Sequence, residues 1–235
     1  MTLIPIMKRI GRLCLTALVG FFAISLFGVI LLKWVDLPTS SIMLQHRFKA
    51  MGSAKVPPLK YEWVDYEDMP PSIKMAVIAA EDQAFARHIG FDVEAIVRAV
   101  HYNKGHRRTR GASTISQQVA KNVFLWQERN LLRKGLEVYF TVLIEGVWGK
   151  KRILEVYLNV AQMGKNLFGI KAASIAYFKK EPKKLSKEQA ALLAAILPSP
   201  VRYSAINPSP YVRNRQHWIL QQMNQLGQDF YLKQL

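Results

Sequence analysis

The apolar residues of this chain form one long uninterrupted run, followed by segments in which they recur at helical spacing. The run covers Leu13–Leu32, twenty residues without a charge. From Ser72 onward the apolar positions recur mostly three and four residues apart, which is the spacing of one buried helix face. Alternating β-branched stretches are few, and no internal repeat is present. The pattern predicts a mainly α domain with helices at about 72–84, 92–102, 114–124, 131–147, 150–161, 167–178, 186–196 and 210–226.

The apolar run near the N-terminus predicts a transmembrane helix. At ~1.5 Å per residue, a helix of this length spans ~30 Å, the thickness of the hydrocarbon core of a bilayer. A cleaved signal peptide would have an apolar region of only ~7 to 15 residues, followed closely by a small-x-small site. Here Lys33-Trp34-Val35-Asp36 follows, which favours an uncleaved anchor. Three basic residues precede the run and one follows it, so the N-terminus is predicted to be cytoplasmic.

The charge of the chain indicates an anionic partner. The formal net charge is +17, from 33 basic and 16 acidic residues, and without residues 1–35 it is still +13. Such a surface attracts nucleic acid, anionic lipid or a substrate that bears pyrophosphate. No zinc-finger spacing, helix-turn-helix pattern or aromatic RNA motif occurs, and the basic part is predicted to lie outside the cytoplasm. We therefore expect no nucleic acid partner and favour membrane lipids or a lipid-linked phosphate. The single cysteine, Cys14, excludes an intrachain disulfide.

Two adjacent carboxylates, Glu81 and Asp82, stand at the end of a predicted apolar helix. Pro71 suits the first helical position, and one buried face is formed by Ile73, Ala76, Val77, Ala80 and Ala84. A carboxylate beside such an apolar element can have a raised pKa, which is what a general base needs. The alternative is an exposed acidic helix end that pairs with Arg87 or His88. We expect His88 to form local bonds within this stretch.

Further polar clusters follow along the chain. Gly111–Gln118 combines small residues, a Ser/Thr cluster and paired amides, which suits a helix start and contacts to sugar hydroxyls. Lys121 lies three residues after Gln118, on the same helical face. His101–Arg110 is a basic stretch that we expect to break two helices and to lie near lipid headgroups, or to be only a solvated loop.

A third cluster combines opposite charges on one helix. Glu137 is three residues after Lys134 and four after Arg133, so the three side chains should project to one side. For helices in general, an exposed ion pair of ~0.3 to 0.5 kcal/mol is the simpler explanation of such a pattern. The spacing alone does not distinguish such an ion pair from a functional cluster, and the wider sequence context decides between these two explanations.

Four sequence blocks carry a resemblance to a known family. They are E-D-x-x-F-x-x-H-x-G-x-D from Glu81, G-[AG]-S-T-[IL]-[ST]-Q-Q from Gly111, R-K-x-x-E from Arg133 and K-x-x-I-L-E-x-Y-L-N from Lys150. In this order they resemble the bacterial peptidoglycan glycosyltransferases, a domain that also forms the first half of bifunctional penicillin-binding proteins. The resemblance runs from about Tyr66 to Ser209. No S-x-x-K motif of a transpeptidase occurs, so the chain is most similar to the monofunctional, membrane-anchored members.

The chain departs from the family pattern after Asn159. Members often carry a Tyr or Glu there, followed by a small Gly-x-Gly loop, whereas this chain has Gln162-Met163-Gly164-Lys165-Asn166.

The resemblance implies a fold, an arrangement of segments and a set of site residues. The fold would be lysozyme-like and mainly α, with residues 1–12 cytoplasmic, 13–35 a transmembrane anchor, 36–65 a stalk and connecting loop, and 66–235 the glycosyltransferase domain. Glu81 would be the catalytic base and Glu137 the second catalytic carboxylate, which supports the departing pyrophosphate. Substrate contacts are implied for Asp82, Arg98, Ser113, Thr114, Gln118, Lys121, Arg129, Arg133 and Lys134. No metal ligands are expected among them and no cofactor is required, although Mg²⁺ or Mn²⁺ on the pyrophosphate stays open.

The implied reaction is polymerisation of lipid II into β-1,4 glycan strands with release of undecaprenyl pyrophosphate. The implied partners are lipid II, the growing glycan strand, membrane lipids and other cell-wall synthesis or division proteins. The domain would be periplasmic, held at the inner membrane by a single span. Two alternatives are kept: a lysozyme-type lytic enzyme, which has no use for a cationic phosphate site, and a non-catalytic wall-synthesis scaffold.

Overall fold

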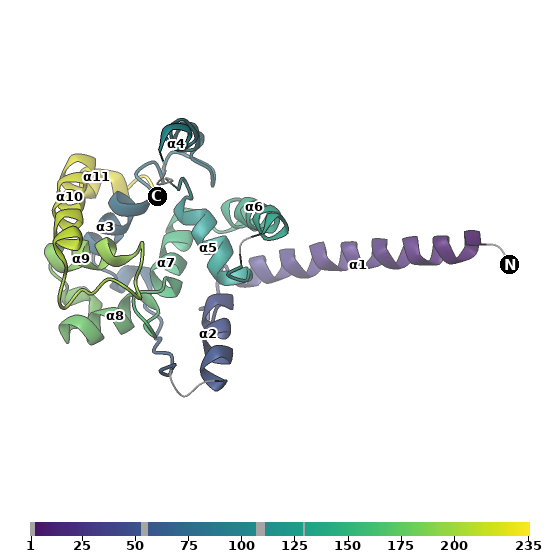
Figure 1. Cartoon of the computed structure of the whole chain (residues 1–235), viewed down its shortest axis with the longest axis horizontal. Helices are drawn as coiled ribbons and strands as arrows, with labels where there is room; N and C mark the ends of the chain where they lie inside the picture. Colours follow the sequence, from purple (N-terminus) through teal and green to yellow (C-terminus); the bar gives the residue numbers. More distant parts are fainter. Residues whose placement is uncertain (1–2, 53–55, 107–110, 129) are drawn as a thin grey trace. The chain divides into compact units, whose positions relative to one another are not determined.

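The computed structural model describes residues 3–52, 56–106, 111–128 and 130–235. The chain divides into two compact units, Met1–Asp36 and Leu37–Leu235. The first unit contains helix α1 (Leu3–Leu31), and the second contains the other helices (Figure 1).

Helix α1 is the candidate membrane anchor. Its stretch Met7–Leu31 is long and apolar enough to cross a bilayer, with a mean hydropathy of 2.5. The helix begins before the predicted start at Leu13, so the basic residues Lys8, Arg9 and Arg12 lie within it. By length and composition, the helix fits the predicted anchor.

The second unit is built from helices, which confirms the prediction of a mainly α fold. Among the described residues, β structure is limited to two isolated bridges. The helices are α2 (Ser41–Met51), α3 (Pro71–Glu81), α4 (Val93–Gly105), α5 (Ile115–Phe124), α6 (Leu131–Val147), α7 (Lys150–Val160), α8 (Gly169–Phe178), α9 (Lys187–Ile196), α10 (Pro210–Leu226) and α11 (Gln228–Leu232). Short 3-10 turns lie at Tyr66–Asp68 and Pro182–Lys184.

Helices α3 and α7 are among the most buried helices and form part of the core. Every residue of α3 from Ile73 to Ala79 is buried, and α9, α10 and α11 pack against this helix (Figure 1). Helix α7 is buried from Ile153 to Val160 and packs against α5 and α8. Glu81 is thus the last residue of one of the most buried helices, at the point where the chain leaves the core.

Two predicted helix boundaries differ from the structure because of contacts with other segments. Helix α3 ends at Glu81 rather than at residue 84, because Asp82 leaves the helical conformation and its carboxylate accepts the Ile115 backbone N–H at 3.0 Å. Helix α8 begins at Gly169 rather than at residue 167. Leu167 and Phe168 are drawn into the bridges Lys60↔Leu167 and Gln162↔Phe168 instead.

Two segments predicted as loops are partly helical. The stretch 36–65, expected to be a stalk and connecting loop, contains α2. This helix buries only Ile42 and Met43, too few residues to give a clear periodic signal. Helix α4 runs on to Gly105 and includes the first half of the basic stretch His101–Arg110, which was expected to break the helices. Residues 107–110 of that stretch lie outside the described residues.

Candidate active site

The carboxylate of Glu81 lies largely buried at the C-terminal end of α3. Its side chain is 16% exposed. The Gln118 Nε2 of α5 donates a hydrogen bond to Oε2 at 2.9 Å, and the Arg215 Nη2 of α10 lies 3.5 Å from Oε1. Burial raises the pKa of Glu81 above its usual value, because the opposing effects of Gln118 and Arg215 do not fully offset the desolvation. The carboxylate is therefore suited to take up a proton.

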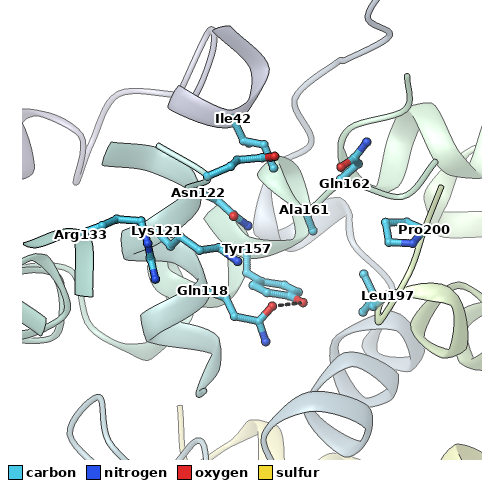
Figure 2. A pocket seen from close by; sticks show the side chains of 11 residues that line it. Ile42, Gln118, Lys121, Asn122, Arg133, Tyr157, Ala161, Gln162, Leu197 and Pro200 are labelled. Carbon is cyan, nitrogen blue, oxygen red and sulfur yellow. Dashed lines mark hydrogen bonds between the residues drawn. The ribbon is translucent and has the colours of Figure 1, made fainter. Parts of the chain in front are cut away.

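Gln118 is itself oriented by a tyrosine from α7. The fully buried Tyr157 hydroxyl donates to Gln118 Oε1 at 3.3 Å, the contact drawn in Figure 2. Burial raises the pKa of Tyr157 well above its ordinary value, so the hydroxyl keeps its proton. With its oxygen held in this way, the Gln118 amide presents its NH₂ group to Glu81.

Asp82 has a different role from its neighbour. Its buried carboxylate accepts a hydrogen bond from His88 Nε2, which lies 3.0 Å from both oxygens, as well as the Ile115 N–H. His88 therefore bonds within the motif, as predicted. The alternative for Glu81 and Asp82 was an ion pair with Arg87 or His88. Asp82 forms this pair with His88, and Glu81 takes no part in it.

Glu137 on α6 is held between two cations. Arg133 Nη1 and Lys134 Nζ each lie 2.5 Å from one of its oxygens, which confirms that the three side chains project to one side. The exposed ion pair considered as the alternative is wrong for Glu137 and Arg133, which are 3% and 8% exposed. Lys134 is about half exposed. The carboxylate thus compensates a buried guanidinium that also lines a cavity.

The two partners of the Gln118–Glu81 hydrogen bond line two different polar cavities. One, of about 290 Å³, is lined by Gln118, Lys121, Arg133 and Tyr157 together with Ile42 of α2 and residues that follow α9. Figure 2 shows Lys121, Arg133, Gln118 and Tyr157 among the side chains that line this cavity. The other, of about 410 Å³, is lined among others by Glu81, Asp82, Arg98, Ser113 and Thr114. Because Gln118 of the first lining hydrogen-bonds to Glu81 of the second, the lining of the cationic cavity contacts that of the carboxylate-lined cavity.

The remaining predicted residues are placed as follows. Thr114 caps α5, and its buried hydroxyl donates to the Gly90 carbonyl at 2.6 Å and accepts the Gln117 N–H at 3.2 Å. Arg98 lies 3.2 Å from Glu94 on the exposed side of α4. Arg129 lies outside the described residues. Among the described residues, no cluster of three His, Cys, Asp or Glu side chains is placed to hold a metal ion.

Sequence reasoning missed the residues of α10 that lie around Glu81. Arg215 contacts Glu81, and Trp218 lines the carboxylate cavity. A signal for Arg215 was present, because it lies three residues after Val212 and four before Ile219, both fully buried. A charged residue on the buried face of a helix needs a partner, so this arginine could have been assigned one.

Comparison with known proteins places these features in a family. A family model described as Transglycosylase matches residues 49–224. A protein of Pseudomonas entomophila named biosynthetic peptidoglycan transglycosylase is 48% identical over 230 residues, which is 98% of this chain and 96% of that protein. Proteins of the same name from Pseudomonas aeruginosa and Haemophilus influenzae are 48% and 50% identical, over 97% and 89% of this chain and 99% and 86% of theirs. The chain therefore belongs to the transglycosylase family, and the resemblance to the peptidoglycan glycosyltransferases is confirmed.

Proposed function

We propose that this chain is a peptidoglycan glycosyltransferase that polymerises lipid II into β-1,4 glycan strands and has no transpeptidase activity. The observation that carries the proposal is the contact between the linings of the two cavities, with the buried carboxylate of Glu81 in one lining and the cations Lys121 and Arg133 in the other. Transfer of a sugar from a pyrophosphate donor needs these two features in adjoining places: a base for the acceptor hydroxyl and cations for the departing phosphates.

In the proposed reaction, Glu81 removes the proton from the 4-hydroxyl of the acceptor N-acetylglucosamine. This oxygen forms a bond to the anomeric carbon of N-acetylmuramic acid on the growing strand, and the bond from that carbon to the pyrophosphate oxygen breaks. Undecaprenyl pyrophosphate leaves with inversion, and Glu81 returns its proton to water. The raised pKa of Glu81 brings the carboxylate closer to the range in which a general base works best.

The leaving group already carries its charge, so it needs electrostatic stabilisation more than a proton. Lys121 and Arg133 line the cavity proposed for it, and Lys134 stands beside Arg133 on α6. Arg129 is assigned here by family resemblance alone. Glu137 fixes the direction of the Arg133 guanidinium, which can then contact phosphate oxygens through its other N–H groups. The acceptor is assigned to the other cavity, with Asp82, Arg98, Ser113 and Thr114 in its lining.

We include no protein-bound cofactor in this proposal. A Mg²⁺ or Mn²⁺ ion would have to be held mainly by the pyrophosphate oxygens of the substrate, because both Glu137 oxygens already accept bonds from cations. The protein would contribute charge and orientation.

We further propose that the enzyme works at the inner membrane, with residues 1–12 in the cytoplasm, 13–35 as the anchor, 36–65 as the connection and 66–235 as the periplasmic domain. The composition of α1 supports the anchor. Helix α4 supports contact with membrane lipids, because Val93, Val97 and Val100 are exposed on a helix that also carries Arg98 and Lys104. The glycan strand, lipid II and cell-wall synthesis or division proteins are the proposed partners.

The test is polymerisation of fluorescent lipid II by the full chain in detergent, analysed on a gel before and after muramidase digestion. We expect a muramidase-sensitive ladder from the native protein and a loss of about 10²- to 10⁴-fold in Glu81→Gln, the range for removal of a general base. An unchanged ladder in the variant would remove Glu81 from its role. Release of small muropeptides from preformed wall, with no ladder, would favour the lytic alternative.

A further inference from the structure

The turn that follows Glu81 is held in place by several distant elements. After α3 ends, the backbone folds back through the bonds Phe85 N–H to Asp82 C=O at 3.1 Å and Arg87 N–H to Ala84 C=O at 2.7 Å. Helix α5 holds Asp82 through the Ile115 N–H, and Lys150 Nζ lies over the buried Phe85 ring at 4.6 Å from its centroid. These contacts approach the turn from α5 and from the N-terminal end of α7.

Another set of contacts comes from the C-terminal helices α10 and α11. Gln83 Nε2 donates to Gln222 Oε1 of α10 at 3.1 Å. The Tyr231 hydroxyl of α11 donates to the Gln83 carbonyl at 3.0 Å and accepts the Ala86 N–H at 3.0 Å. One side chain thus joins two backbone groups of the turn that would otherwise need separate partners.

The Tyr231 side chain is suited to this bridging position. The residue is 5% exposed, although α11 is short and close to the C-terminal end of the described chain. Burial raises the pKa of Tyr231, so its hydroxyl keeps the proton that it donates to Gln83. Tyr231 also lies beyond residues 49–224, the part of the chain matched by the family model.

We propose that Tyr231 is a positioning residue for the Glu81 base, acting through the backbone of the turn from Gln83 to Ala86. The proposal rests on the proposed function, because Glu81 is the base only if the chain transfers glycosyl groups. Glu81 lies two residues before Gln83, and its carboxylate must stay within reach of the acceptor hydroxyl. A shift of this backbone by a fraction of an ångström would misplace the carboxylate and let water reach it.

The test is the variant Tyr231→Phe in the full chain, which keeps the ring and removes only the hydroxyl. We expect kcat with lipid II to fall by about 10- to 100-fold, because small misplacements of reacting groups have effects of this size. KM should stay within about twofold, since no substrate contact is removed. The acid limb of the pH profile of kcat should move to lower pH, because water that enters beside Glu81 weakens the burial that raises its pKa.

The matched control is Tyr211→Phe, the same chemical change at an exposed tyrosine of α10, which should leave kcat and the pH profile unchanged. Native kcat and an unmoved acid limb in Tyr231→Phe would overturn the proposal. So would a loss of kcat that only follows the unfolded fraction in a thermal melt, with no movement of the limb.

Amide hydrogen exchange separates this proposal from the proposed function. Exchange at residues 83–88 should be faster in Tyr231→Phe than in the native protein, and unchanged exchange would overturn the positioning role. If the native protein makes no glycan at all, it is the proposed function that fails, and the exchange result still shows whether Tyr231 holds the turn.

Discussion

Glu81 and Glu137 are two largely buried carboxylates in the same domain, and the protein surrounds them in opposite ways. Glu137 has a cation 2.5 Å from each of its oxygens, and both cations come from the preceding turn of its own helix. Glu81 has one neutral amide at 2.9 Å and one arginine at 3.5 Å, from two other helices. One carboxylate is fully compensated, and the other is only partly so.

The difference separates a carboxylate that binds and orients cations from one that is suited to exchange a proton. Both oxygens of Glu137 are occupied by cations, which leaves neither of them for a substrate proton. A buried ion with weaker compensation lets desolvation dominate, and this is why the pKa of Glu81 is raised. The comparison predicts opposite effects on stability when each carboxylate is replaced by its amide.

Glu137→Gln should give the largest loss of stability. It leaves the buried Arg133 guanidinium without its counter-ion, and breaking a buried pair in this way typically costs ~3 kcal/mol or more. For a chain of this size, that loss lowers Tm by roughly 6 to 12 °C, measured by thermal unfolding in detergent.

The matched control for Glu137→Gln is Glu94→Gln. It breaks another arginine–glutamate pair with i,i+4 spacing, but Glu94 is 87% exposed and its partner Arg98 is 66% exposed. We expect a change below about 0.5 kcal/mol there. Equal Tm shifts in the two variants would contradict the distinction between a buried and an exposed pair.

Glu81→Gln should have a smaller effect on stability, and of the opposite sign. Because the folded-state pKa of Glu81 is raised, its contribution to stability is fully present below the unfolded pKa and is lost as pH rises through the folded pKa. A neutral amide avoids that loss. The variant should therefore have a higher Tm than the native protein at pH 8, and the difference should shrink toward pH ~4, near the ordinary pKa of glutamate. A lower Tm for Glu81→Gln at pH 8 would show that Gln118 and Arg215 compensate the carboxylate fully.

The same contrast explains what could be predicted from the sequence. The Glu137 cluster is visible because its partners lie three and four residues away on one helix, where spacing fixes direction. Its burial was not visible, since burial depends on how α6 packs against α5 and α7. The end of α3 was predicted three residues too late because the Ile115 N–H, which captures Asp82, comes from a distant helix.

The surroundings of Glu81 were predicted only in part for the same reason. Gln118 is 37 residues away in the sequence and was identified through its motif rather than through its contact. Arg215 and Tyr231 lie still further along the chain. The position of Arg215 on the buried face of α10 indicates that it needs a partner, but the sequences of α10 and α11 do not indicate that the partners of Arg215 and Tyr231 lie near Glu81. Long-range packing of α10 and α11 on α3 brings them there.

Arg215→Gln should have the smallest effect of the three, and it tests the weaker compensation of Glu81 directly. Arg215 lowers the pKa of Glu81 against the larger, opposing effect of burial, so its removal should raise that pKa further. Since the base must be ionised to act, the acid limb of the pH profile of kcat should move to higher pH, while the rate on the alkaline plateau stays within about threefold.

Arg213→Gln removes the same charge from an exposed position two residues earlier on α10 and should leave the limb in place. If both variants move the limb equally, the effect comes from the net charge of the domain; if neither does, Arg215 has no electrostatic influence on the base. A movement to higher pH in Arg215→Gln but not in Arg213→Gln, together with a movement to lower pH in Tyr231→Phe, would establish that the C-terminal helices adjust the base in two separate ways, by charge through α10 and by position through α11.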